Sequence, residues 1–217
     1  MKKFELTNEF VTNMFGTKLF RIRALVEFGD VEAGELGGYV EKESNLGHDD
    51  NAWVYGDARV YDNARVYGDA RVYGDAQVSD NAWVYGDARV YDNARVYDNA
   101  RVYGDAQVSG DARVYDNARV YGDAWVYGNA RVCGDALVCG DARVCGNGDY
   151  AYAHGFGSVN RTTTFFRLKD GGVGVRCGCF YGTLAQFRDK IRETHGETKK
   201  AQEYLMLADL MKLRFEK

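Results

Sequence analysis

Proline is absent from this chain of 217 residues, although average usage near 5% would give about ten. A strand whose amide groups all donate to a neighbouring strand cannot accept proline, which has no N–H group. The absence therefore favours a chain built from closely hydrogen-bonded strands.

Long hydrophobic runs are absent as well, and the five cysteines are an odd number. No apolar segment reaches the ~20 residues of a membrane span, and the first five residues lack the core of a signal peptide. Cys133, Cys139 and Cys145 recur six residues apart, and Cys177 and Cys179 lie two apart in a predicted strand. We expect free thiols and a reducing compartment, hence a cytoplasmic protein.

The chain also lacks a large excess of charge of one sign. The net charge is −4, and residues 52–147 contain fourteen Asp, ten Arg and no Lys. No basic stripe is free of neighbouring acidic residues. This distribution argues against nucleic acid as a partner.

One six-residue phrase, called a hexad here, fills residues 52–147 sixteen times without interruption. Alanine recurs at every sixth position from Ala52 to Ala142, and valine at every sixth position from Val54 to Val144. Arginine occupies ten of the sixteen positions between them, and tyrosine eleven of the sixteen positions after valine. The last two residues of a hexad are Gly-Asp, Asp-Asn or Gly-Asn. A fixed short period indicates a solenoid whose units bury their apolar faces by stacking.

Each hexad predicts a short strand followed by a corner. Side chains alternate along a strand, so the Ala and Val of Ala-Arg-Val-Tyr point to one side and the Arg and Tyr to the other. The next two residues tolerate positive φ and hydrogen-bond their own backbone, which is typical of a turn. The pattern predicts a prism with an interior of valine and alanine. The period alone leaves the number of sides and the handedness open.

The hexad Val-Tyr-Gly-Asp-Ala-Arg resembles the hexapeptide repeat of left-handed parallel β-helices, in which a small residue follows an aliphatic one after four positions. That family places three hexads in each triangular coil, so stacked positions would lie 18 residues apart. The resemblance implies an all-β solenoid, a left-handed parallel β-helix roughly 25 Å tall at ~4.8 Å per coil.

The whole chain resembles bacterial and phage-borne hexapeptide-repeat proteins. The resemblance rests on residues 36–46 (Leu-Gly-Gly-Tyr-Val-Glu-Lys-Glu-Ser-Asn-Leu), the hexads and residues 178–183 (Gly-Cys-Phe-Tyr-Gly-Thr). Such proteins are often labelled transferases because they share the β-helix. A fold carries little information about function, so the label gives weak support for catalysis.

A second repeat of thirty residues is superposed on the hexads, because residues 52–81 closely resemble residues 82–111. Thirty residues make five hexads, which is not a whole number of three-hexad coils. We therefore expect Trp53 and Trp125 to share one column of the surface and Trp83 to lie on another. This mixing of faces argues against one flat ligand-binding face, such as an ice-binding surface.

The first 51 residues are expected to form an N-terminal β cap, because the end of a solenoid exposes strand edges and an apolar cross-section. Alternation over Lys18–Val26 predicts a strand. Val40, Ser44 and Leu46 fit two irregular hexads. Two extra residues before Ala52 make the last break in register.

Residues 148–217 follow a different pattern and are expected to form a small α+β cap with the order ββαα. Residues 162–168 and 173–180 predict two strands, joined by a Lys-Asp-Gly-Gly turn. This cap covers the other end of the predicted prism.

Two helices are predicted after these strands. The first lies near residues 184–194, with Thr183 as its N-cap, Gly196 as its stop, and an apolar face. The second lies near residues 198–215 and also carries apolar residues at helical spacing. The faces expected to be buried are Leu184, Phe187 and Ile191 in the first helix and Ala201, Tyr204, Leu205, Ala208 and Met211 in the second.

Candidate catalytic and metal-binding residues are few. In the family that the hexads resemble, acyltransferases use a histidine near the edge of the β-helix, and carbonic anhydrases hold a metal through three coil histidines. This chain has only His48, His154 and His195, none within the hexads. His48 is either a general base or a solvated turn residue. A zinc site from Cys177, Cys179, His154 and His195 has suitable ligand types, but the two cysteines lack the usual C-x-x-C spacing.

The tyrosines and arginines that point outward are the main candidates for binding. Stacked coils would place tyrosine above tyrosine, with arginine alongside and aspartate at the corners. Calcium could bind the aspartates, but the arginines of ten of the sixteen hexads supply counter-charge. Such columns stabilise the solenoid through cross-strand pairs worth ~0.2–1 kcal/mol each, and they are rich in residue types favoured at protein interfaces. The predicted binding residues are Trp53, Arg71, Tyr73, Trp83, Arg89, Tyr91, Arg101, Tyr103 and Trp125.

We predict a non-catalytic β-helical scaffold, without cofactor or metal, that binds another protein through the Tyr/Arg surface or the C-terminal module. A phage-encoded factor that acts on a host protein is one setting that the resemblance suggests. Self-association into a homotrimer is a further possibility. The alternatives are an acyltransferase with a site between subunits and a protein that sequesters a small anionic molecule in an Arg/Tyr pocket.

Overall fold

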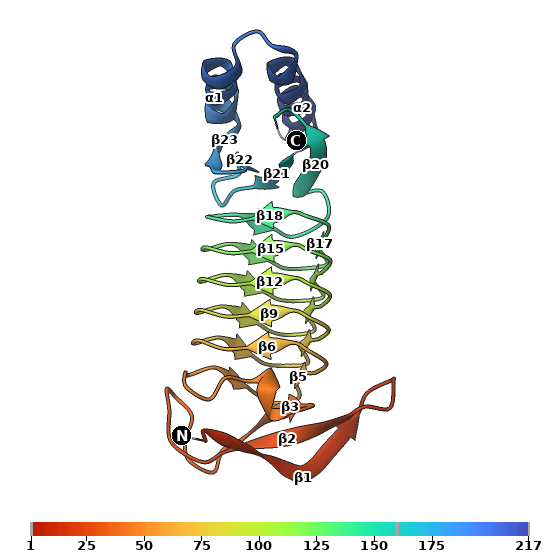
Figure 1. Ribbon diagram of the computed structural model, residues 1–217, viewed down its shortest axis with the longest axis vertical. Coiled ribbons are helices and arrows are strands. Elements are labelled where there is room, and N and C mark those ends of the chain that lie inside the picture. Colours follow the sequence, from red (N-terminus) through yellow and green to blue (C-terminus); the bar gives the residue numbers. More distant parts are fainter. Residues whose placement is uncertain (1, 159–160, 217) are drawn as a thin grey trace.

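The computed structural model describes residues 2–158 and 161–216. Short parallel strands stack into a solenoid of about six turns, with a β hairpin at one end and a sheet with two helices at the other (Figure 1). The predicted β-solenoid is confirmed.

Three parallel sheets run along the length of the solenoid, one on each side. Strands follow one another every six residues, and each pairs with the strand 18 residues away, as Val90 does with Val72 and Val108. The hexad strands of the first sheet are β5 (Arg59–Val60), β8 (Gln77–Val78), β11 (Arg95–Val96), β14 (Arg113–Val114) and β17 (Arg131–Val132). Those of the second are β4 (Trp53–Val54), β7 (Arg71–Val72), β10 (Arg89–Val90), β13 (Gln107–Val108), β16 (Trp125–Val126) and β19 (Arg143–Val144). Those of the third are β6 (Arg65–Val66), β9 (Trp83–Val84), β12 (Arg101–Val102), β15 (Arg119–Val120) and β18 (Leu137–Val138).

The interior of the solenoid consists of the hexad alanines and valines. Each of them is at most 1% exposed, from Ala52 to Val144. Backbone N–H groups donate to carbonyls one coil further on, as Arg89 does to Ala106 at 2.9 Å and Tyr91 to Val108 at 3.0 Å. An inserted proline would break this ladder. The sequence prediction of an apolar shaft is therefore confirmed.

The N-terminal cap contains one strand more than the sequence predicts. β1 (Phe4–Thr12) pairs antiparallel with β2 (Lys18–Ala24), and β2 pairs with β3 (Leu36–Val40). β3 then joins β5 in parallel, with Val40 opposite Val60. Their separation of twenty residues agrees with the two extra residues predicted before the hexads. A single-turn 3-10 helix, η1 (Glu43–Asn45), follows β3.

Gly37 in β3 lies where a side chain does not fit. A Cβ at this position would come within 2.6 Å of the Val54 carbonyl oxygen and 2.7 Å of the Trp53 ring. The cap therefore packs directly on the first hexad coil because this residue is glycine.

The C-terminal module is a four-stranded antiparallel sheet with two helices, so the predicted ββαα order was incomplete. Its strands are β20 (Tyr150–Phe156), β21 (Arg161–Arg167), β22 (Val173–Cys177) and β23 (Phe180–Thr183). The sequence prediction missed β20 and β23, and it extended β22 through the turn at Gly178. β21 separates two cores, because Phe166 packs into the solenoid interior and Phe165 into the module.

Both helices begin and end close to the predicted residues. α1 (Leu184–His195) is capped by Thr183, whose Oγ1 accepts from the Gln186 N–H at 3.3 Å, and Gly196 ends it. α2 (Lys199–Phe215) begins after Thr198. Neither helix, nor any other in the described part of the chain, combines the length and apolar character needed to cross a membrane.

Every corner from Gly56 to Gly140 begins with a residue whose φ lies between 56° and 76°, either glycine or aspartate. Aspartate offsets the strain of this conformation by bonding to the next coil: the Asp92 carboxylate accepts from the Gly110 N–H at 3.1 Å, and the Asp116 carboxylate from the Gly134 N–H at 3.0 Å. The predicted positive φ at the corners is confirmed.

This corner chemistry predicts a difference between two substitutions at Gly104. A Cβ there would lie 3.1 Å from the Gly122 nitrogen, at a φ of 68°. We expect Gly104→Ala to lower the free energy of unfolding by about 1 kcal/mol or more, and Gly104→Asp to lower it less, because its carboxylate can accept from the Gly122 N–H. Thermal unfolding followed by circular dichroism measures both. An equal loss in the two variants would contradict the proposed role of the aspartate.

Candidate binding surfaces

The nine predicted binding residues divide between two faces of the solenoid. The face of β4, β7, β10, β13, β16 and β19, called the β10 face here, carries six of them, and the face of β6, β9, β12, β15 and β18, called the β12 face, carries three. Trp53 and Trp125 share a column and Trp83 lies on the other face, as predicted. The residues therefore do not form one continuous site. The six are Trp53, Arg71, Tyr73, Arg89, Tyr91 and Trp125, and the three are Trp83, Arg101 and Tyr103.

Trp53 is buried, which corrects its assignment to a binding surface. Its side chain is fully covered by the N-terminal cap. The ring of Phe4 meets it edge-on at 6.2 Å, and the ring of Phe28 at 5.4 Å. Trp53 joins the cap to the first coil and is not available to a partner.

Trp83 lies between two arginines on the β12 face. The Arg101 guanidinium is 5.0 Å from a ring centroid of Trp83, and that of Arg65 is 5.8 Å away. These residues occupy equivalent positions of adjacent coils, so the pairs follow directly from the register. Cation–π contacts of this kind contribute ~0.5–1 kcal/mol each at exposed sites.

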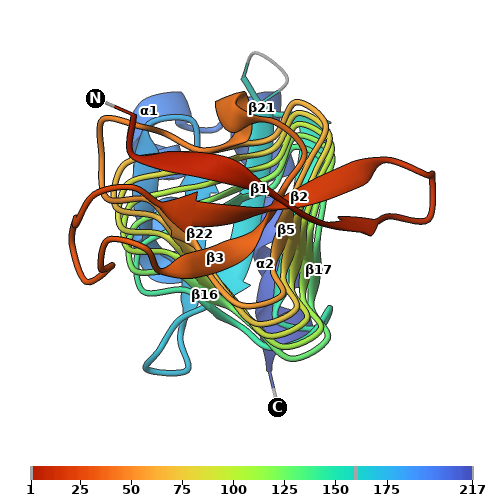
Figure 2. The same cartoon turned by 90° about the horizontal axis from the view of Figure 1, so that it is seen from below.

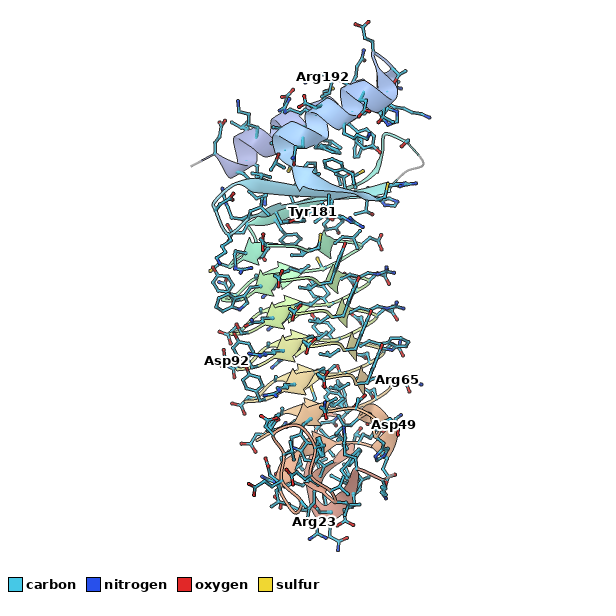
Figure 3. All side chains as sticks on the ribbon, turned by 90° about the vertical axis from the view of Figure 1, so that its left-hand side faces the viewer. Arg23, Asp49, Arg65, Asp92, Tyr181 and Arg192 are labelled. Carbon is cyan, nitrogen blue, oxygen red and sulfur yellow. The ribbon has the colours of Figure 1, made fainter. Side chains whose placement is uncertain are left out.

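The tyrosines form stacked columns that follow the coils. On the β12 face, Tyr67, Tyr85, Tyr103 and Tyr121 stack with ring centroids 4.9, 4.9 and 5.0 Å apart and planes within 3° of parallel. Figure 3 shows the rows of side chains along the solenoid, with Arg65 and Asp92 on opposite sides. Each ring covers its neighbours, so the columns stabilise the solenoid whether or not they bind a partner.

Arg71 on the β10 face is already paired within the chain. Its Nη1 is 2.9 Å from Oδ2 of Asp30, and the other carboxylate oxygen, Oδ1, accepts from the Tyr55 hydroxyl at 3.2 Å. A surface pocket of about 360 Å³ lies here, lined also by Tyr73 and Arg89. Asp30, from the cap, reduces the positive charge of this part of the predicted surface.

Trp125 fills a break in the tyrosine column of the β10 face. The column has serine at position 109, between Tyr91 and Tyr127. The Trp125 Nε1–H donates to the Ser109 Oγ at 3.1 Å, and the Trp125 ring lies 4.9 Å from that of Tyr127. This predicted binding residue therefore covers Ser109.

Cys177, Cys179 and His195 line one surface pocket of the C-terminal module, whereas His48 lies in the N-terminal cap. His48 stacks on Phe4 at 4.4 Å, and its Nδ1 accepts from the Lys3 backbone N–H at 3.2 Å. His48 therefore lies in a bend of the N-terminal cap, with its side chain 28% exposed. Within residues 2–158 and 161–216, no group of three His, Cys, Asp or Glu side chains is placed to hold a metal ion. All five cysteines are free thiols, as predicted.

One surface that the sequence prediction missed lies on α2. Met206, Leu210 and Leu213 are 71%, 54% and 70% exposed. They follow the spacing i, i+4, i+7 and so form an apolar stripe along one side of the helix. The signal was present in the sequence, since α2 carries apolar residues on two sides, but only the side that packs in the module was recognised.

The tyrosine surfaces predict a loss of stability at high pH. Partial burial raises the pKa of Tyr67, Tyr73, Tyr97 and Tyr103, and partial burial next to Asp30 raises the pKa of Tyr55 to about 12. Unfolded tyrosine ionises near pH 10, so the native state keeps these hydroxyls protonated more strongly than the unfolded state does. Their contribution to stability is therefore complete below pH ~10 and is lost as the pH rises toward ~12.

We expect the thermal midpoint of unfolding to fall over this interval, while the absorbance of tyrosinate rises only above pH ~10. Tyr55→Phe removes one ionising hydroxyl and should reduce the alkaline decrease in stability. If the native tyrosines titrate like free tyrosine, burial in the columns does not suppress ionisation of their hydroxyls.

Comparison with known proteins agrees with the solenoid. A family model described as the YdcK beta solenoid repeat matches the hexads in overlapping segments: residues 58–74, 64–80, 76–92, 88–104, 94–110, 106–122, 112–128 and 124–140. No curated protein sequence matches the chain. The chain is thus a repeat β-solenoid protein whose coils are similar to the YdcK beta solenoid repeat.

Proposed function

We propose that this protein is a rigid, non-catalytic scaffold that binds another protein through its C-terminal module. The observation that carries the proposal is the apolar stripe of Met206, Leu210 and Leu213 on α2, all more than half exposed. A contiguous apolar strip on a helix is a typical docking element for a protein partner.

The module does not need this stripe for its own packing. Its core already contains Phe165, Val175 and Phe187 from the sheet and α1, and the opposite side of α2 fills the remainder. The α2 residues in that core are Ala201, Tyr204, Ala208, Met211 and Phe215. The stripe therefore faces outward because the helix has apolar residues beyond those that its core requires.

The solenoid suits the role of a support. Its interior is filled by short side chains, and each coil is hydrogen-bonded to the next. A shaft of this kind offers no internal space for a substrate, so catalysis would have to take place on the surface. The module lies at one end of this shaft and is presented away from the N-terminal cap (Figure 1).

The proposal includes finer assignments that the sequence suggests. The coils would wind to the left, as in the hexapeptide-repeat proteins that the hexads resemble, and 18-residue pairing is compatible with three hexads per coil. The protein would act in the cytoplasm, as a phage-encoded factor that binds a host protein. The Tyr/Arg columns would act mainly as intramolecular support, with a homotrimer as the assembly to test by measuring the mass in solution.

The α2 stripe can be tested by placing charge on it. Met206→Lys together with Leu213→Lys should reduce partner capture from host lysate about ten-fold, because an apolar contact at the centre of an interface is lost. Both positions are exposed, so the thermal midpoint should stay unchanged. Quantitative affinity capture with the full chain measures the effect.

A matched control is Ala185→Lys with Asp189→Asn on the exposed side of α1, which adds the same two units of positive charge. This variant should capture the partner as well as the unchanged chain does. Equal capture by all three proteins would reject α2 as the docking surface, and a loss in both variants would indicate a general effect of charge.

A further inference from the structure

The tyrosine column on the third face of the solenoid has a gap one ring wide. This face, called the β11 face here, consists of β5, β8, β11, β14 and β17, and its column contains Tyr61, Ser79, Tyr97 and Tyr115. Tyr97 and Tyr115 stack at 5.1 Å in adjacent coils. Tyr61 and Tyr97 lie two coils apart, about 10 Å at a spacing of ~4.8 Å per coil. One planar ring between them would have the spacing of the other columns on both sides.

A cavity of about 380 Å³ lies at this gap, with Tyr61, Ser79 and Tyr97 in its lining. The tip of the β1–β2 hairpin overhangs it and contributes Met14 and Phe15. These two side chains are 87% and 79% exposed, so they border the cavity without filling it. Figure 2 shows the hairpin extending past the coils on the side of β5 and β17.

Three arginines surround the cavity and give it positive charge. Arg59, Arg95 and Arg113 line it, and none of them forms an ion pair with a residue of the described chain. The one carboxylate in the lining, Asp80, accepts from the Ser79 hydroxyl at 2.9 Å and faces the corner of the next coil. Guanidinium groups arranged in this way are suited to phosphate or carboxylate.

The equivalent gap in the tyrosine column of the β10 face is closed by a side chain. There, Ser109 is covered by Trp125, sixteen residues further along the chain. The residue sixteen positions after Ser79 is Arg95. Both serines are buried, but Ser109 lies under the Trp125 ring, whereas Ser79 belongs to the lining of the arginine-lined cavity.

We propose that this slot binds a planar aromatic molecule that carries an anionic group. The ring would stack between Tyr61 and Tyr97, as bases stack on aromatic side chains in single-strand binding proteins. The anionic group would lie against Arg95 and its neighbours in the arginine column. This site lies within one chain and is independent of the α2 stripe.

Calorimetric titration of the full chain tests the two parts of the ligand separately. AMP carries both ring and charge, adenosine only the ring, and inorganic phosphate only the charge. We expect AMP to bind at least about ten-fold more tightly than either of the others, because stacking and ion pairing each contribute. Anthranilate, an aromatic carboxylate, distinguishes a carboxylate ligand from a nucleotide. No binding of AMP or anthranilate at about 1 mM would overturn the proposal.

Ser79→Tyr is the decisive variant, because it completes the column with a residue that the repeat normally uses. It should preserve or raise the thermal midpoint and abolish binding of AMP. Cys145→Tyr places tyrosine at the same hexad position on the β10 face, where Cys145 is exposed, and should leave binding unchanged. Retained binding in folded Ser79→Tyr would overturn the assignment.

The charge contribution has its own pair of variants. Arg95→Gln should weaken AMP about ten-fold and leave adenosine unaffected, because only the ion pair is removed. Arg101→Gln, on the β12 face, should change the affinity for neither AMP nor adenosine. If Arg95→Gln and Arg101→Gln weakened AMP binding equally, binding would depend on net charge alone. That result would contradict the proposed position of the anionic group. Met206→Lys with Leu213→Lys should bind AMP normally, so this test is separate from that of protein capture.

Discussion

The constraint on which this structure depends is the pairing of each hexad strand with the strand 18 residues away. Hydrogen bonds from one coil to the next fix that separation, as between Arg89 and Ala106 and between Tyr91 and Val108. The Ala and Val shaft is continuous because this register places small and branched side chains over their own kind. A shift by one residue would turn the valines outward, so the register resists change along the whole array.

The same register determines the surface. Any outward residue lies directly beside the residues 18 positions before and after it, so the surface consists of columns rather than scattered side chains. Stacks such as Tyr73 on Tyr91, 4.9 Å apart, are direct consequences of the repeat. The array therefore has stabilising aromatic columns wherever tyrosine recurs. A tyrosine column by itself is thus weak support for a binding site.

Most of the solenoid could be predicted from the sequence because its determinants are local and periodic. The six-residue period gave the strands, the corners and the apolar shaft, and simple arithmetic placed Trp53 and Trp125 together and Trp83 apart. The helices were also predictable, since Thr183 and Gly196 are strong local signals for where α1 begins and ends.

The ends of the chain were harder to predict because they depend on contacts between distant residues. β1 contains a polar stretch from Thr7 to Glu9 and is a strand because it pairs with β2. Trp53 has the same neighbours in sequence as Trp83, an alanine before it and Val-Tyr after it. Local sequence could not show that the cap covers one tryptophan and leaves the other partly exposed.

The proposed slot depends both on the local repeat pattern and on contacts between residues that are distant in the sequence. Gln-Val-Ser occurs at residues 77–79 and 107–109, thirty residues apart, so the two copies look equivalent in sequence. Five hexads do not complete a whole number of coils, so the two serines fall on different faces, and only one of them is covered by tryptophan. The β1–β2 hairpin then overhangs the other. Duplication of a repeat can thus create a new surface site without disturbing the shaft, because the interior residues keep their phase while the outward neighbours change.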